Sequence, residues 1–511
     1  MKSKNSVSNS IWNAITNLTY VAVNGLLGLI VTKFIIQYFG SDINGINSSS
    51  FQLVNILLIL EGGLTLATNV ALFAPIRKNN HEQINGIISA TNKRFKKIGI
   101  LFFILGTLSS LLYSVFVHTE VSYWVVVYFF MMSLIPAAVN LSVTMKYRSL
   151  LLSHQKEYVI SLITLITITI GYSLTIFAIN RGCGVWGAKA FITFFALVNS
   201  AIIVFYCKKN FKYIDLKAQP DYGAIKGTKD VLMGKISGAL FTALPILIIS
   251  VIFPSGAKIA SVYAVYASVF SFLSNAIQSF SSAPRFAFGQ LFVEGDYKKI
   301  RCLFLKYEFI VFVFQSVAMG CAMCLILNFV DLYTLGVTDI QYHNPMIALI
   351  LGLTSYISTL HKPCGHMINM SGNFKIYKNI NVFSVIALVV LAAVGYFIGK
   401  FWDLELYGIL IGIGFAALLK CACEIFYSHK KILKLSILKS LRILIPNFLI
   451  FLGSYMCSSL LRKADGFIQL GVHAVIVLFL LAIISIIVNF VINNNMVIQT
   501  IRMLNGNKKH Y

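Results

Sequence analysis

The sequence predicts an all-α polytopic membrane protein with fourteen transmembrane helices, and three observations support this fold class. Apolar stretches of about twenty residues, each long enough to cross a hydrocarbon core of about 30 Å as a helix, alternate with short loops. Basic residues gather on every second loop. Hydrophobic residues fill 58% of the 511 positions and charged residues only 12%, so lipid replaces water around most of the surface.

The expected spans follow one another along the chain with no soluble domain between them. Their approximate ranges are 15–39, 50–75, 98–118, 122–145, 158–179, 185–206, 236–253, 259–283, 307–330, 346–370, 380–399, 404–426, 441–461 and 467–492. All four tryptophans fall at span ends, as in an interfacial aromatic belt: Trp12, Trp124, Trp186 and Trp402. No small-residue cleavage site follows the first span, which is expected to remain as a signal anchor.

Fourteen crossings place both termini and six loops on one side of the membrane. When residues within five positions of a span's end are counted with the adjoining loop, that side carries 33 of the 42 lysines and arginines. The opposite side carries 6, and 3 lie inside spans. By the positive-inside rule the rich side is cytoplasmic. The sequence therefore predicts a multi-pass protein of the bacterial inner (cytoplasmic) membrane with both termini in the cytoplasm.

The net charge of +25 follows from this topology, because the basic residues lie where anionic lipid headgroups attract them. No dense basic domain is present, so membrane lipids and not nucleic acid are the expected partners of these charges. The nine cysteines are scattered. Cys321 and Cys324 lie within an apolar span, where the sequence favours packing over redox chemistry.

The longest polar insert, 207–235, holds seven lysines and is expected to be a cytoplasmic linker. It separates an N-lobe of six spans, 1–206, from a C-lobe of six spans, 236–426. A C-terminal helix pair and tail, 427–511, complete the chain. Two six-helix lobes of this kind are expected to surround a central cavity and to rock for alternating access.

A faint internal repeat supports the two lobes, because it pairs spans six apart. Span 2 ends with Ala74-Pro75-Ile76-Arg77 and span 8 with Ala283-Pro284-Arg285. Spans 4 and 10 end in turns with matching residues: Ser153, Lys156 and Tyr158 in the first turn, and Ser371, Lys375 and Tyr377 in the second. Since six is an even number, the lobes would be parallel repeats related by an axis along the membrane normal.

The sequence lacks the motifs expected of an enzyme. No Gly-x-x-x-x-Gly-Lys-Ser/Thr phosphate loop occurs, so no nucleotide hydrolysis by that route is expected. His361, Cys364 and His366 do not share one helix face and have no carboxylate beside them in sequence. They are expected to be satisfied polar groups in a helix bundle. The sequence predicts a non-enzymatic protein with no cofactor and no metal site.

The first span carries a polar stripe. Its members recur at helical spacing on one face: Asn13, Asn17, Tyr20, Asn24 and Gly28. Such a stripe either forms interhelical hydrogen bonds or lines a water-filled cavity. Asn17, Tyr20 and Asn24 are therefore candidate substrate-binding residues.

Ionisable residues inside spans are costly and often functional. Glu61 lies near the middle of the second span and precedes Gly62-Gly63, where the helix can bend. Its carboxyl group is expected either to act in transport or to form a neutral hydrogen bond across helices.

Three intramembrane lysines are further candidates for binding an anionic substrate. Lys362 adjoins Pro363, whose kink frees backbone carbonyls, and it has no acidic residue three or four positions away. Lys420 precedes Glu424 at the spacing of an intrahelical ion pair. Lys33 lies on the side of its helix opposite the asparagines. Snorkelling to the membrane surface is the alternative for Lys33 and Lys362.

Four short segments, in span order, resemble motifs of the polysaccharide flippases in the multidrug/oligosaccharidyl-lipid/polysaccharide exporter superfamily. They are Lys33 with Phe39-Gly40 and Gly45, Glu61-Gly62-Gly63-Leu64, Tyr147-Arg148-Ser149-Leu150 with Lys156 and Tyr158, and Gly365 with Ser371-Gly372 and Lys375. Two departures occur, since Glu61 replaces the commoner aspartate and Phe39 the commoner leucine.

The resemblance implies a flippase that turns a polyprenyl-diphosphate-linked oligosaccharide from the cytoplasmic to the outer leaflet. The usual cargo is a repeat unit of O-antigen, capsule or exopolysaccharide, and a glycan polymerase and glycosyltransferases are the implied partners. Lysines of the cavity would bind the diphosphate as point charges, and amides and tyrosines would hold the sugar.

Two other functions stay open. A cation-coupled multidrug exporter of the same fold would favour acidic and aromatic residues in its cavity, whereas lysines prevail among the intramembrane charges here. A membrane-embedded glycan polymerase or ligase would use a large outer loop, whereas the longest expected outer loop, 331–344, has only Asp331, Asp339 and His343 as titratable residues.

Overall fold

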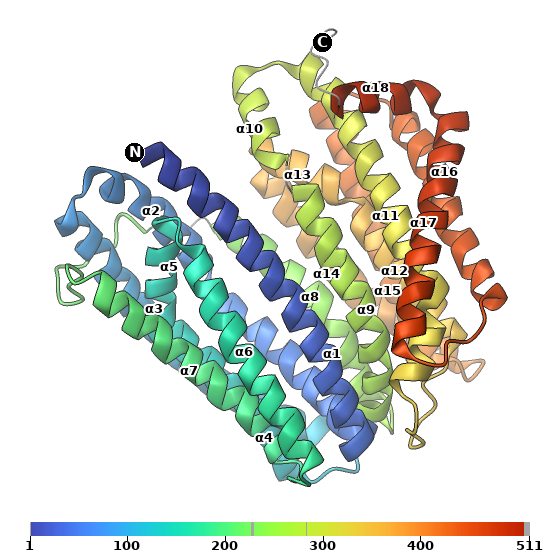
Figure 1. Cartoon of the computed structure of the whole chain (residues 1–511), viewed down its shortest axis with the longest axis horizontal. Coiled ribbons are helices and arrows are strands. Elements are labelled where there is room, and N and C mark those ends of the chain that lie inside the picture. Colours follow the sequence, from blue (N-terminus) through green and yellow to red (C-terminus); the bar gives the residue numbers. More distant parts are fainter. Residues whose placement is uncertain (1, 226–228, 283, 505–511) are drawn as a thin grey trace. The chain divides into compact units, whose positions relative to one another are not determined.

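The computed structural model describes residues 2–225, 229–282 and 284–504. Every regular element in these ranges is helical, which confirms the predicted fold class (Figure 1). In the first half, the helices are α1 (Lys2–Leu57), η1 (Leu58–Glu61), α2 (Leu64–Lys78), α3 (His81–Phe116), α4 (Tyr123–Val139), η2 (Asn140–Thr144), α5 (Met145–Ser153), α6 (Glu157–Asn180), α7 (Gly187–Asn210) and α8 (Lys229–Ile252).

The second half continues the helical pattern to Leu504. Its helices are α9 (Gly256–Ser282), α10 (Arg285–Glu294), α11 (Tyr297–Tyr333), α12 (Pro345–Leu360), α13 (Lys362–Met370), α14 (Phe374–Lys400), α15 (Glu405–Tyr427), η3 (Ser428–Leu433), α16 (Ile437–Met456), η4 (Cys457–Leu460), α17 (Phe467–Ile492) and α18 (Asn494–Leu504).

Eleven of the described helices are long and apolar enough to cross a membrane, so this is a multi-pass membrane protein. The number is lower than the expected fourteen for three local reasons. The second span begins within α1, which joins the first two spans in one long helix bent at Gly40, and the chain then turns at Gly62-Gly63. The seventh appears as the shorter apolar helix Ser237–Ile252. The tenth is divided at His361 into α12 and α13, because Pro363 begins a new helix there.

The chain forms two compact units. Unit 1 comprises Met1–Ser261 and Gly336–Ile340, and unit 2 comprises Val262–Leu335 and Gln341–Tyr511. Unit 1 therefore continues through α8, beyond position 206 where the N-lobe is expected to end. In this unit α8 packs against α1, which also contacts α4 and α6. The six-span lobes and the linker thus stay a prediction.

In unit 1 the polar insert after α7 is bound along α3 as far as Ile225. Asn85 donates to the carbonyl of Tyr213, and Ser89 donates to the carbonyl of Ala218 at 2.7 Å. Arg94 donates to the carbonyl of Ile225 at 2.8 Å. This half of the expected linker is therefore an ordered strap on α3, and residues 226–228 lie outside the described ranges.

In unit 2, helices α14 and α15 pack closely against each other. Each helix carries a Gly-x-x-x-Gly motif, Gly395 with Gly399 and Gly408 with Gly412. A methyl group added at Gly408 would lie 2.1 Å from the carbonyl oxygen of Gly395. Small residues at this spacing let helix backbones approach closely in lipid, where packing and not water exclusion drives association.

The two turns matched in sequence have the same local geometry within their own units. In unit 1, Gln155 takes a left-handed φ of 58° two residues before α6 begins. In unit 2, Gly372 takes a left-handed φ of 78° two residues before α14 begins. The other part of the repeat includes Ala283, which lies outside the described residues.

Candidate functional site

Unit 1 contains a cavity of about 390 Å³, a size common for small-molecule sites. It lies between α1, α4, η2, α5, α6 and α7. The lining residues are Tyr20, Phe51, Pro136, Ala137, Asn140, Arg148, Thr164, Thr167, Ile168, Gly171, Tyr172, Ile192, Phe195, Ala196, Asn199 and Ser200.

The backbone of the fourth span shapes one wall of this cavity. Pro136 lies inside α4 and has no backbone N–H to donate. The helix then widens to a π-helical turn, Asn140–Thr144, before α5 begins. Such π-turns are rare and often occur at functional sites, because they change the direction of the side chains that follow. Asn140 in this turn and Arg148 in α5 both reach the cavity.

A hydrogen-bonded chain of polar side chains crosses the cavity wall. Arg148 donates from Nη2 to Oδ1 of Asn199 at 3.2 Å. The amide nitrogen of Asn199 in turn donates to the hydroxyls of Thr164 and Thr167 at 3.1 and 3.0 Å. These two bonds use both amide protons of Asn199 and fix which of its atoms faces the arginine.

Some residues of the polar stripe of α1 bind other helices, and others line the cavity. Asn13 binds the α5–α6 turn, accepting from the backbone N–H of Tyr158 at 2.7 Å. Tyr20 lines the cavity. Asn24 accepts from the hydroxyl of Tyr172, another cavity residue, at 3.4 Å. Asn17 is exposed. Of the three predicted binding residues in the stripe, the structure therefore places Tyr20 in the cavity wall and Asn24 in contact with another residue of that wall, Tyr172.

Glu61 has a local structural contact. Gly62 and Gly63 both adopt left-handed φ angles, 65° and 74°, so the chain turns sharply before α2 begins at Leu64. The Glu61 carboxylate accepts from the backbone N–H of Thr65 at 3.1 Å. It thereby satisfies an N-terminal donor of α2, where the helix dipole also favours negative charge. Neither Glu61 nor the half-buried Lys33 is among the residues that line the cavity.

In unit 2 the structure brings Lys362 and Lys420 to the same carboxylate. Glu424 is fully buried and accepts from Nδ1 of His361 at 2.8 Å. Lys362 and Lys420 both lie close enough to Glu424 for electrostatic attraction. The sequence did not reveal this carboxylate near Lys362, since 62 positions separate the two residues. With two lysines around one carboxylate, the cluster keeps a surplus of positive charge.

Gly365 provides the space for this cluster. A methyl group at this position would lie 2.7 Å from Oε2 of Glu424 and 3.5 Å from the Tyr377 ring. The neighbouring side chains of α13 bind elsewhere: Cys364 contacts His429, and His366 contacts Gln278. His361, Cys364 and His366 therefore have separate partners.

A second buried acid in unit 2 was not among the sequence candidates. Glu308 is fully buried and accepts a hydrogen bond from the hydroxyl of Ser440, which also bonds Nε2 of His429 at 2.6 Å. The only sequence signal was an acidic residue at the second position of the expected span 307–330. Its partners come from α16 and η3, more than a hundred residues further along the chain.

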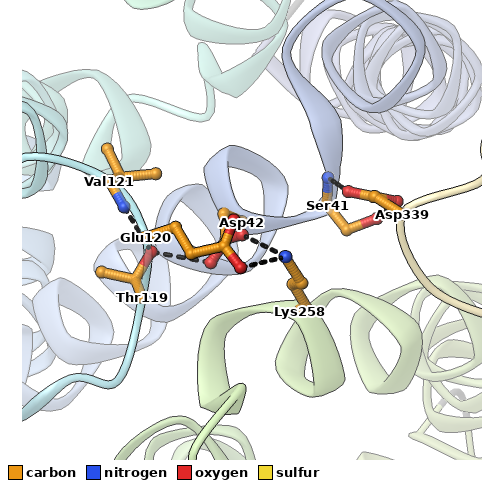
Figure 2. Close-up of polar contacts among 7 residues, drawn as sticks. All are labelled: Ser41, Asp42, Thr119, Glu120, Val121, Lys258 and Asp339. Atoms are coloured by element: carbon orange, nitrogen blue, oxygen red, sulfur yellow. Dashed lines mark hydrogen bonds and ion pairs between the residues drawn. The ribbon is translucent and has the colours of Figure 1, made fainter.

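A polar cluster joins several loops of unit 1 near the bend of α1 (Figure 2). Gly40 breaks the helix with a φ of 83°, and Asp339 accepts from both the N–H and the hydroxyl of Ser41 at 2.7 Å. Lys258 pairs with Glu120 at 2.7 Å and with Asp42 at 3.5 Å. All these segments belong to loops or helix ends that the positive-inside rule assigns to the outer side.

No family model and no curated protein sequence matches this chain, but solved structures match it through their fold. A multidrug resistance MATE family transporter of the MOP superfamily, in its inward-facing conformation, aligns with a TM-score of 0.66 and 14% identity. That alignment covers 82% of this chain and 99% of the transporter.

The lipid II flippase MurJ, in an inward closed conformation, also aligns with a TM-score of 0.66, at 13% identity. It covers 95% of this chain and all of MurJ. A eukaryotic MATE transporter aligns at 0.57 with 13% identity, over 86% of this chain and 99% of that one. The chain therefore has the fold of MATE and MurJ transporters of the MOP superfamily. Membership of the polysaccharide flippase branch stays a prediction.

Proposed function

We propose that this protein is a flippase that moves polyprenyl-diphosphate-linked oligosaccharide repeat units from the cytoplasmic to the outer leaflet of the inner membrane. The observation that supports this most is the similarity to MurJ, whose alignment covers 95% of this chain, against 82% for the drug transporter with an equal TM-score.

The distribution of charge supports an anionic cargo. Arg148 lines the cavity of unit 1, and Lys362 and Lys420 outnumber Glu424 in unit 2. A diphosphate that leaves water needs compensating positive charge, because an uncompensated anion in a low-dielectric interior is strongly disfavoured. In this proposal Lys362, assisted by Lys420 and with Lys33 as a further candidate, binds the diphosphate.

The remaining parts of the proposal concern the substrate's other groups and the setting. Sugar hydroxyls would contact Tyr20, Asn24 and the exposed Asn17. Glu61, at the bend before α2, would act in the conformational change of transport. The lipid tail would stay in the bilayer while two lobes rock for alternating access. Glycosyltransferases would supply the substrate on the cytoplasmic side, and a glycan polymerase would consume it outside.

A cation-coupled multidrug exporter is the second candidate, and the TM-score of 0.66 with a MATE transporter favours it. Such a protein needs negative charge where a cationic drug binds. No aspartate or glutamate is among the residues that line the described cavity of unit 1. This favours the anionic cargo.

Depletion of the protein in cells tests the proposal. We expect surface polysaccharide to fall while lipid-linked oligosaccharide accumulates in the membrane, shielded from an added lectin until the cells are opened. Expression of the wild-type protein should restore the surface polysaccharide and remove the accumulated lipid-linked oligosaccharide. An unchanged amount of surface glycan, together with raised sensitivity to cationic drugs, would support the exporter instead.

A further inference from the structure

We propose that the cavity of unit 1 is a binding site for an oxyanion carried on a polar ring, with Arg148 as the residue that holds the negative charge. This rests on the proposed function and makes it more specific, since it predicts an acidic group on the transported oligosaccharide in addition to the diphosphate of its lipid. The two sources of such a group are a sugar carboxylate and a phosphate ester.

The first argument is the incomplete pairing of Arg148. A guanidinium group has five N–H donors, but one hydrogen bond, to Asn199, is found among the described residues. Its Nε atom is buried and has no acceptor in the described part of the chain. No described carboxylate lies within 4 Å of it. The side chain as a whole is only partly buried, but a cation with open donors away from water is costly unless an anion enters, and the planar fork of arginine suits a carboxylate or phosphate.

The second argument is that the surroundings hold the guanidinium in place. Asn199 binds Thr164 and Thr167 through both amide protons, so its oxygen stays directed at Arg148. Tyr20 lines the same cavity as Arg148. A preorganised arginine loses less side-chain entropy when an anion binds.

The third argument comes from the rest of the cavity wall. Aromatic rings from three helices face the space, Tyr20 and Phe51 from α1, Tyr172 from α6 and Phe195 from α7. The buried Oδ1 of Asn140 is an acceptor without a described donor. Aromatic faces with hydrogen-bonding groups between them suit a ring that has apolar faces and hydroxyl edges, such as a pyranose.

Direct binding to the full-length protein in lipid nanodiscs tests this inference. The probes are methyl β-glucuronide, glucose 1-phosphate and the neutral methyl β-glucoside. We expect wild-type protein to bind at least one anionic probe about tenfold or more tightly than the glucoside, as a charge-assisted bidentate contact implies. The preferred anionic probe identifies the source of the group, a sugar carboxylate or a phosphate.

The arginine variants assign the effect to the site. Arg148→Gln should remove the preference for the anionic probe, and Arg148→Lys should keep part of it, because lysine retains the charge without the fork. Arg181→Gln is the matched control, since Arg181 lies exposed at the end of α6 and stacks on Phe177. Equal affinity of the wild type for all three probes, or an Arg148→Gln variant that keeps the preference, would overturn the inference.

The same purified protein, in nanodiscs for binding and in proteoliposomes for translocation, separates this inference from the proposed function. If the Arg148-dependent preference is present but the protein translocates no lipid-linked oligosaccharide, the site stands and the flippase proposal fails. If translocation occurs and the preference is absent, the flippase proposal stands and the Arg148 site fails. The comparison of the three probes uses the wild-type protein alone. It therefore tests the inference even if a variant folds poorly.

Discussion

At the scale of single residues, the structure explains why some candidates could be found in the sequence and others could not. The sequence identified Tyr20 as a candidate because it lies on a polar stripe with helical spacing, and the structure places it in the cavity wall. Arg148 appeared only within a motif, because its role depends on Asn199 and the threonines of another helix. The carboxylate near Lys362 was hidden for the same reason, since Glu424 approaches this lysine only through tertiary packing.

Glu61→Gln is expected to lower export without unfolding the protein. The glutamine oxygen can still accept from the N–H of Thr65, so loss of stability should stay below about 1 kcal/mol, while the charge near Gly62-Gly63 is gone. Surface glycan measured at equal protein level should fall. Undiminished glycan would leave Glu61 with its helix-capping role alone.

Lys362→Ala is expected to abolish export at normal protein level, and Lys362→Arg to keep part of it. Alanine leaves Glu424 with less positive charge around it and the diphosphate without its proposed ligand, whereas arginine retains the charge. Lys298→Ala, at an exposed position in the first turn of α11, is the control and should export normally. Full surface glycan in Lys362→Ala cells would exclude this role and leave Lys33 as the candidate.

At the scale of helices, hydropathy located the spans well, but their breaks depend on details that a window average hides. Gly62 and Pro363 interrupt spans that read as continuous apolar runs, and Gly40 bends α1 between the first two expected spans. The sequence predicted only a linker for the segment bound along α3. The acceptors that this segment offers to Asn85, Ser89 and Arg94 are backbone carbonyls. Backbone acceptors are the same for every sequence, so composition cannot reveal them.

Gly408→Ala should destabilise the protein because of the close approach of α14 and α15. The added methyl group would meet the Gly395 carbonyl at 2.1 Å, and overpacking of this kind costs about 1–3 kcal/mol. A lower melting temperature of the purified protein is the expected result. Gly453→Ala in α16, where a methyl group meets nothing within 4 Å, should leave the melting temperature unchanged or slightly raised. Equal melting temperatures for the two variants would contradict the packing argument.

Asp339→Ala should loosen the bend of α1. The carboxylate caps the helical segment that begins at Ser41 (Figure 2), and loss of such a cap costs about 0.5–2 kcal/mol. Asp339→Asn, which keeps one acceptor oxygen, should lose less. Thermal unfolding followed by intrinsic fluorescence measures both, with Asp465→Ala at an exposed loop position as the control. A larger loss for the control than for Asp339→Ala would refute the capping role.

At the scale of the whole molecule, the fold class followed from hydropathy and charge because the bilayer constrains the chain so strongly. The division into two six-span lobes stays a prediction, and in unit 1 α8 packs with α1 despite the polar insert before it. Cargo identity is the least accessible property, because the same fold is found in MATE drug transporters and in the MurJ flippase.

The membrane orientation is a prediction at this scale. Reporter fusions after Asn180 and after Gly466, which lie at a helix end and just before α17, should report the outer side because of the asymmetry of basic residues. A fusion after Gly45 should do the same, although this residue lies in the second segment of α1. A fusion after Lys217, in the strap region, should report the cytoplasm. Cytoplasmic activity at two of the three outer positions would invert the topology.

Reconstitution of the purified protein tests the central claim most directly. Proteoliposomes would carry a fluorescent polyprenyl-diphosphate oligosaccharide in both leaflets, and an added glycosidase would cleave only the accessible sugars. We expect cleavage to approach completion with wild-type protein and to stop near one half with protein-free liposomes and with Lys362→Ala. Cleavage that stops near one half with well-folded wild-type protein would contradict the account.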